Sequence, residues 1–177
     1  MSWILTASGR HLDYIQPNVG DINILDIAQS LANESRYAGH TRFFYSVAQH
    51  SWLASFVVPR QHALEALLHD AAEAYCKDIP SPLKALLPDY REIEARVDGV
   101  IRKAFGLPFT ETPEVKRADL VVLATERRDL MPADGTPWRS LEGIEPLPRK
   151  IAGMLPSRAQ AIFLRRYIEL TENRRAA

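Results

Sequence analysis

Residues 63–75 read ALEALLHDAAEAY, an apolar helical pattern that contains an adjacent histidine and aspartate, His69 and Asp70. An imidazole and a carboxylate are costly to bury without a partner. A divalent cation is one partner that would satisfy both side chains. This stretch therefore predicts a core helix that also carries part of a metal site.

The segments on both sides of this stretch also have helical patterns. We expect helices over about 21–35, 46–58, 60–76, 89–105, 113–130 and 157–172, with a short helix over 82–87. Residues 3–14 alternate weakly around Ser8-Gly9 and predict a short hairpin. Residues 131–156 hold five of the twelve prolines and predict a long ordered loop. The predicted fold is an all-α bundle with one N-terminal β-hairpin, as a single domain over 1–177.

Composition excludes several classes of protein. The formal net charge is zero and the isoelectric point is near 7, which gives no general electrostatic attraction to nucleic acid or membranes. One cysteine, Cys76, excludes an intrachain disulfide. Without a signal peptide or a long apolar run, we expect a cytoplasmic protein. An anionic substrate would need a local basic site.

Two more metal-capable side chains lie in separate helical patterns. His50 lies in SVAQHS and Asp119 lies in VKRADL. With His69 and Asp70 they form a set of two imidazoles and two carboxylates, which suits Mn, Co, Fe, Ni or Zn better than calcium. Glu73, one helical turn after His69, is placed to act as a general base or acid through a metal-bound water.

Each of these residues also has a structural interpretation. His50 alone on a helix is more often a structural histidine with satisfied hydrogen bonds, and Asp119 alone is more often paired with an arginine, here Arg117 or Arg127. Residues 126–129, Glu-Arg-Arg-Asp, read as a solvated or ion-paired face. The complete set of four, with an acid at the right spacing, is harder to explain in this way.

The chain resembles the HD-domain phosphohydrolase family. The resemblance lies in SVAQHS, in LLHDAAEAY with its HDxxE pattern at 69–73, and in VKRADL. Residues 77–87, KDIPSPLKALL, are similar to nucleotide-acting members, the bacterial 5′-deoxynucleotidases. Through RYAGHTRFFYSVAQHS and LATERRDL, the resemblance extends over nearly the whole chain to a prophage-encoded branch, with phage dATP triphosphohydrolases as more distant cousins.

The resemblance implies roles for particular residues. It implies His50, His69, Asp70 and Asp119 as metal ligands, Glu73 and Asp78 as catalytic residues, and Arg36, Tyr37 and Lys84 as substrate-binding residues. Tyr37 stands where the deoxynucleotidases carry a tryptophan that contacts the sugar, so selection against a 2′-hydroxyl is open.

The substrate residues also have structural alternatives. Arg36 could form a salt bridge to Glu34 or a neighbour, Lys84 could be a solvated helix charge, and Asp78 could cap the turn before Pro80. Read physically, a guanidinium fork and an ammonium suit phosphate oxygens, so we expect Arg36 and Lys84 to be surface cations that bind phosphate.

The expected function is metal-dependent hydrolysis of a (deoxy)nucleotide 5′-phosphate, of the 5′-deoxynucleotidase type. A dNTP triphosphohydrolase is the alternative reaction, and a regulatory interaction protein on the HD scaffold is the alternative of another class. One transition-metal ion is expected, with additional Mg for a triphosphate substrate. The expected partners are a small nucleotide and a second copy of the chain in a homo-oligomer, with no membrane and no nucleic acid.

Overall fold

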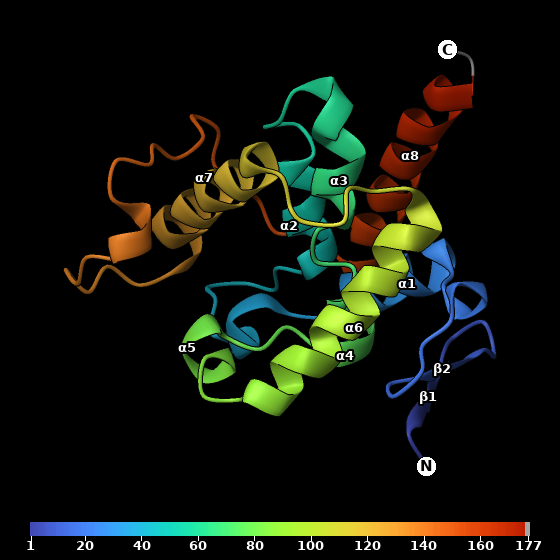
Figure 1. Cartoon of the computed structure of the whole chain (residues 1–177). Helices are drawn as coiled ribbons and strands as arrows, with labels where there is room; N and C mark the ends of the chain where they lie inside the picture. The colour runs from blue at the N-terminus through green and yellow to red at the C-terminus, as the bar shows by residue number, and fades with distance from the viewer. Residues whose placement is uncertain (176–177) are drawn as a thin grey trace.

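The computed structural model describes residues 1–175, with side chains described through Glu172, and is mostly helical with one small antiparallel sheet (Figure 1). The α-helices are α1 (Ile24–Asn33), α2 (Val47–Ala54), α3 (Ala63–Leu68), α4 (Glu73–Cys76), α5 (Ser81–Lys84), α6 (Pro88–Phe105), α7 (Pro113–Leu130) and α8 (Pro156–Arg175). The 3₁₀ turns are η1 (Val19–Asp21), η2 (Arg36–Gly39), η3 (Arg60–His62) and η4 (Arg139–Leu141). None of the described helices has the length and apolar character needed to cross a membrane.

The expected hairpin is present. Strands β1 (Trp3–Leu5) and β2 (His11–Asp13) pair antiparallel, with Ile4 opposite Leu12. Gly9 lies in the turn with a φ of 80°, a left-handed conformation that glycine adopts without steric cost. The backbone amide and the hydroxyl of Ser8 both donate to the buried Asp26 carboxylate on α1, which fixes the hairpin to the helical body.

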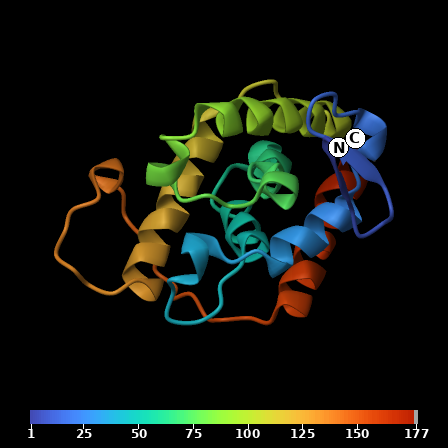
Figure 2. The ribbon, with the colours of Figure 1, turned by 90° about the horizontal axis from the view of Figure 1, so that it is seen from below.

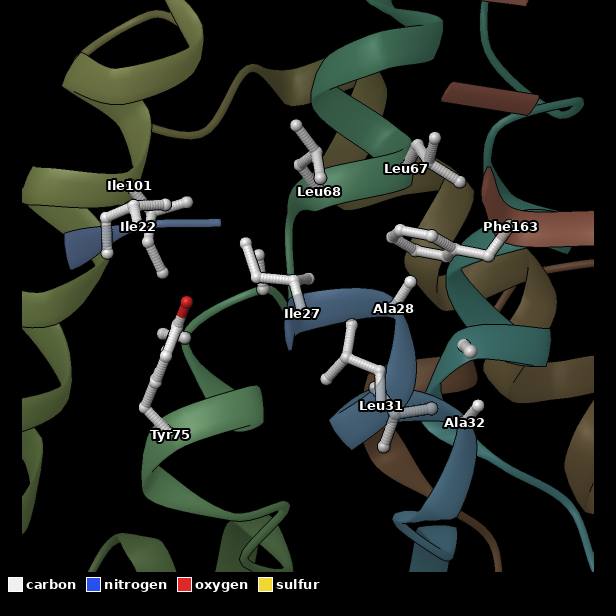
Figure 3. Packing of buried hydrophobic residues seen from close by; sticks show 14 of the residues in the cluster. Ile22, Ile27, Ala28, Leu31, Ala32, Leu67, Leu68, Tyr75, Ile101 and Phe163 are labelled. Carbon is white, nitrogen blue, oxygen red and sulfur yellow. The ribbon is translucent and has the colours of Figure 1, made fainter. Parts of the chain in front are cut away.

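The core forms where α1 packs against α3 and α8. The Asn23 side chain accepts a hydrogen bond from the amide of Leu25 and caps the first turn of α1. The apolar face of α1 then carries fully buried residues toward the other two helices, as Figure 3 shows. The residues at this contact are Ile27, Ala28 and Leu31 of α1, Leu67 and Leu68 of α3, and Phe163 of α8.

Helices α2 and α3 lie near the centre of the molecule, with α1, α6, α7 and α8 around them (Figure 2). Helix α2 packs against α1, α3, α7 and α8, so side chains from all of its faces meet other elements. It ends at Ala54, four residues before the predicted end at Val58, because 55–58 continue as turns with i→i−3 hydrogen bonds such as Phe56 to Leu53.

The single helix predicted over 60–76 was wrong, because the chain leaves the α-helix between α3 and α4. The His69 ring donates from Nδ1 to the carbonyl of Ala66 at 2.8 Å. That carbonyl is the acceptor that the amide of residue 70 would use in a continuous helix, so the side chain competes with the backbone. The next amides bond three residues back, Ala71 to Leu68 and Glu73 to Asp70, which makes a tighter turn.

The long loop after α7 is also present and contains only η4 among its described residues. Its second half is held by Arg128, which donates to the carbonyl of Leu147, and by the amide of Ile151, which donates to Asp129. The first half extends away from the body, as Figure 1 shows. Residues 113–130 and 88–105 form the helices α7 and α6, close to the predicted boundaries.

Candidate metal centre

His50 is a fully buried residue in the middle of α2. The Ser46 side chain accepts from the amide of Gln49 and starts this helix, which places His50 one turn inside it. Its Nδ1 donates to Glu126 Oε1 at 2.6 Å, and its Nε2 lies 3.3 Å from His69 Nε2. The ring is therefore oriented by a carboxylate on one side and presents Nε2 to the other.

His69 and Asp70 lie in the tight turn between α3 and α4. Because His69 Nδ1 donates to the Ala66 carbonyl, the neutral ring carries its free electron pair on Nε2. Asp70 Oδ2 lies 3.3 Å from this Nε2 and 3.5 Å from His50 Nε2. The interrupted helix thus directs both side chains to the same point as His50.

Asp119 completes the cluster from α7. Its Oδ1 lies 3.2 Å from His50 Nε2 and 3.9 Å from His69 Nε2, and both described contacts are to histidines rather than to arginine. Burial alone would raise the pKa of Asp119, but the hydrogen bond and positive charge of His50 hold it well below its usual range. Asp119 is therefore an ionised carboxylate at the edge of the cluster.

The cluster has dimensions that suit one metal ion. One ligand atom each from His50, His69 and Asp119 lie within 4.8 Å of one another. Donors held about 2.0–2.2 Å from a transition ion lie roughly 3–3.5 Å apart, which agrees with the separations of 3.2–3.9 Å found here. These three residues could hold a metal ion, and Asp70 Oδ2 lies beside them. The sequence prediction of one site built by four residues from three separate segments is consistent with this geometry.

A proton occupies the cluster in the absence of metal. Burial and the Arg36 charge lower the pKa of His50, but Glu126 and Asp119 outweigh them and raise it to about 9. The second proton of the His50 ring is on Nε2. This atom faces His69 Nε2, Asp70 Oδ2 and Asp119 Oδ1. A divalent cation would replace this proton, so metal binding at this site is linked to pH.

Glu126 is a site residue that sequence reasoning missed. Residues 126–129 were expected to form a solvated or ion-paired face; Glu126 is ion-paired with Arg36 and His50, but it is completely buried rather than on a surface. Its carboxylate accepts from His50 Nδ1 at 2.6 Å, from the Tyr37 hydroxyl at 2.7 Å and from Arg36 Nε at 3.3 Å. Burial would raise the pKa of Glu126, but Arg36 and His50 lower it to about 2. Its spacing of two turns from Asp119 on α7 could have indicated the shared face.

Arg36 and Tyr37 lie in η2, close to the metal ligands. Arg36 Nη1 lies 3.4 Å from Asp70 Oδ2, and its side chain is only 11% exposed. The expectation of a surface cation was therefore wrong for Arg36, because its guanidinium forms ion pairs with Glu126 and Asp70 in the interior. Tyr37 has a φ of 56°, a left-handed conformation that is uncommon outside glycine. Its hydrogen bond to Glu126 holds it there.

Glu73 is nearly buried, and one of its oxygens is unsatisfied. Oε2 has no hydrogen-bond partner among the described residues, and Oε1 lies 3.7 Å from Lys84 Nζ. Burial raises the pKa of Glu73 well above its usual range, and the nearby Asp70 and Asp78 raise it further. A carboxyl with a raised pKa thus lines the same cavity as the candidate ligands His69 and Asp70.

Lys84 and Asp78 lie near the cluster in different environments. Lys84 Nζ lies 2.7 Å from Glu94 Oε1, so its charge is already matched within the chain. Burial raises the pKa of Asp78, Arg36 lowers it, and Asp70 raises it again. Asp78 is thus a partly buried carboxyl close to Arg36, whereas Lys84 faces α6.

Two cavities adjoin the cluster. The larger, about 740 Å³, lies between the His69–Glu73 turn and α6, and the smaller, about 480 Å³, lies beside Arg36 and Asp78. In the larger cavity carboxylates outnumber cations. The carboxylates are Asp70, Glu73, Glu92, Glu94, Asp98 and Glu111, and the cations are Lys84 and Arg91. Glu111 was not selected from the sequence, and burial raises its pKa, with His69 lowering it and Asp119 raising it.

Comparison with known proteins identifies relatives of this chain. No family model matches the sequence. The uncharacterized protein YfdR of Escherichia coli is 51% identical over 178 aligned positions, which cover 100% of both chains. An uncharacterized protein of Rhodobacter capsulatus is 38% identical over 127 positions, 66% of this chain and 65% of that protein. The identity across the full length of YfdR shows that the chain belongs to the YfdR family.

Proposed function

We propose that the chain is a metal-dependent phosphohydrolase of the HD-domain type that converts a deoxynucleoside 5′-monophosphate and water to a deoxynucleoside and phosphate. The observation that carries the proposal is the convergence of two Nε2 atoms and two carboxylates beside a buried, unsatisfied Glu73. The likeness of SVAQHS, LLHDAAEAY and VKRADL to HD phosphohydrolases supports it.

The four predicted ligands suit a transition ion such as Mn, Co, Ni, Fe or Zn. When bound, such an ion lowers the pKa of a coordinated water and neutralises phosphoryl charge. Hydrolysis forms a bond from the water oxygen to phosphorus and breaks the bond from phosphorus to the 5′-oxygen. The leaving 5′-oxygen needs a proton, and Glu73, whose pKa is raised by burial, is placed to supply it; the proton that the attacking water loses then returns Glu73 to its protonated form.

The unsatisfied Glu73 oxygen favours an enzyme over a purely regulatory scaffold. A buried polar atom without a partner destabilises the fold by about 1–3 kcal/mol. A scaffold that only binds another protein gains nothing from this arrangement, whereas a proton carrier needs a carboxyl oxygen that is not already bonded, beside the bound substrate. The cavity next to Glu73 supplies the space for it.

The charge of the larger cavity favours a monophosphate over a triphosphate. Six carboxyl groups and two cations line it, and Glu94, 2.7 Å from Lys84 Nζ, already compensates the charge of the lysine. Two further phosphates of a dNTP would enter a negative environment and would need accompanying Mg. A monophosphate places one group at the cluster and no more.

The test is turnover by the metal-loaded chain. Purified protein loaded with Mn or Co is incubated with dNMPs, NMPs or dNTPs in separate reactions. A chelator-treated sample is the control. Release of inorganic phosphate from dNMPs supports the proposal. Release of tripolyphosphate from dNTPs would replace it with the triphosphohydrolase reaction, and no turnover of any substrate with any metal would refute it.

A further inference from the structure

The smaller cavity opens beside the cluster at Arg36. This residue lines the cavity, and its Nη1 also lies 3.4 Å from Asp70 Oδ2. Asp78 lines the cavity from the chain segment that follows α4. A molecule with its phosphate at the metal ligands can therefore extend past Arg36 into this space. Its volume of about 480 Å³ is within the range of roughly 300–1,000 Å³ typical of small-molecule sites.

The walls of this cavity are apolar and aromatic. Leu123 and Met131 come from α7 and its C-terminal end, and Tyr37 and Trp138 bring aromatic rings. Among the described residues that line it, Arg36 and Asp78 are the only charged ones, Ser81 and Ser140 add two hydroxyls, and none is an asparagine, glutamine or histidine. Walls of this kind bind a flat, neutral ring through its faces and offer few hydrogen bonds to its edges.

Both aromatic side chains are held in place by other parts of the chain. The Tyr37 hydroxyl donates to buried Glu126 at 2.7 Å, and the residue keeps a left-handed φ of 56°. The Arg127 guanidinium lies 5.1 Å from the centre of the Trp138 ring. The Tyr37 and Trp138 rings lie 6.4 Å apart at 46° to each other, so they form adjoining walls. Rings fixed before binding lose little conformational entropy when a ligand arrives.

The other cavity lacks these properties. Its described lining residues are mainly charged, with six carboxyl groups and two cations, and none of them is aromatic. A heteroaromatic ring placed there would desolvate carboxylates without gaining a stacking partner. The two cavities next to the metal ligands thus differ in chemistry, and only the smaller one suits a base.

We propose that the cavity bounded by Tyr37, Leu123, Met131 and Trp138 is the nucleobase subsite, and that Trp138 on the loop after α7 stacks on the base. The inference rests on the proposed function and adds its specificity: nucleotides are preferred over sugar phosphates. Because the lining offers no amide or imidazole to read base edges, all four common deoxynucleotides bind with similar affinity.

The experiment compares nucleotides with a substrate that has no base. Initial rates are measured for the four dNMPs and for 2-deoxyribose 5-phosphate, with wild type, Trp138→Ala and Trp138→Phe. Trp3→Ala, on the N-terminal hairpin, is the matched control. Loss of one base–aromatic stack raises KM for dNMPs about 5- to 150-fold in Trp138→Ala and leaves the values for 2-deoxyribose 5-phosphate unchanged. Trp138→Phe keeps an aromatic face and restores most of the affinity.

The outcomes separate this inference from the proposed function. An equal loss for the baseless substrate, or no change for any substrate, overturns the assignment of Trp138. If wild type hydrolyses nothing, the proposed function fails. Calorimetric titration with deoxyadenosine then tests base binding in the cavity independently of turnover. Binding that disappears in Trp138→Ala and returns in Trp138→Phe then supports a base site, and no binding to wild type overturns it.

Discussion

Replacing Glu126 with glutamine removes the charge that organises the metal centre and keeps the size of the side chain. The carboxylate accepts hydrogen bonds from His50, Arg36 and Tyr37 within a fully buried environment. An amide offers only one oxygen as an acceptor, and its NH₂ group cannot accept from a guanidinium or a hydroxyl. Glu126→Gln therefore loosens the ring of His50 and leaves part of the Arg36 charge uncompensated.

The magnitude follows from the role of a carboxylate behind a metal-binding histidine. Removing such a partner typically weakens metal binding by about 10–100-fold. Glu126 and Asp119 together raise the pKa of His50 to about 9 against the opposing effects of burial and Arg36, so the loss of Glu126 makes the imidazole a weaker base and ligand. Glu126→Ala breaks a buried ion pair outright and lowers the free energy of unfolding by about 3–5 kcal/mol.

The assay is competition with a chelator at neutral pH. Metal-free wild type, Glu126→Gln and the control Glu114→Gln are titrated with Co or Mn, and dissociation constants are compared. Glu114 is on the same helix, and its side chain is 47% exposed, so its variant binds like wild type. Wild-type affinity in a folded Glu126→Gln would refute the reasoning, because it would mean that His50 is oriented without this carboxylate.

The remaining predictions concern the ligands, the proton carrier and pH. His69→Ala and Asp70→Asn each lower bound metal well below one ion per chain in elemental analysis. Full occupancy in both variants would remove these residues as ligands. The control is Asp89→Asn, which replaces an exposed carboxylate of α6 and keeps the metal. Glu73→Gln keeps the metal and lowers kcat by about 10²–10⁴-fold, and an unchanged kcat across pH would make Glu73 structural. Apparent metal affinity rises about tenfold per pH unit up to the His50 pKa of about 9, since a proton must leave; a flat profile contradicts this.

Much of the fold could be predicted because its elements follow local periodicity. The hairpin around Gly9 and the long helices α6 and α7 have turn or helical signals in their own residues. The break after Leu68 could not be predicted in this way. It depends on a hydrogen bond from the His69 ring to the Ala66 carbonyl, and an apolar pattern does not show which way a ring turns.

The cluster of His50, His69, Asp70 and Asp119 was predictable from residue type and spacing, but the residues that support it were not. Arg36 and Glu126 are separated by 90 positions, so nothing in the local sequence indicates that they pair in the interior. An arginine in a loop and a glutamate in a charged run both suggest exposure when each is considered alone. Trp138 presents the same difficulty, because its place beside Tyr37 depends on the path of a loop without regular structure.

Formal charges at the cluster explain why the proposed divalent ion and a Glu73 carboxyl of raised pKa suit each other. In the absence of metal, the carboxylates of Asp70, Asp119 and Glu126 face the Arg36 guanidinium and a protonated His50, which leaves one negative charge. Exchange of the proton for a divalent cation makes the cluster neutral, so a phosphate dianion meets no net repulsion. An ionised Glu73 beside that dianion would add repulsion again. In the proposed reaction, the raised pKa of Glu73 would reduce this repulsion and favour the form that can donate a proton.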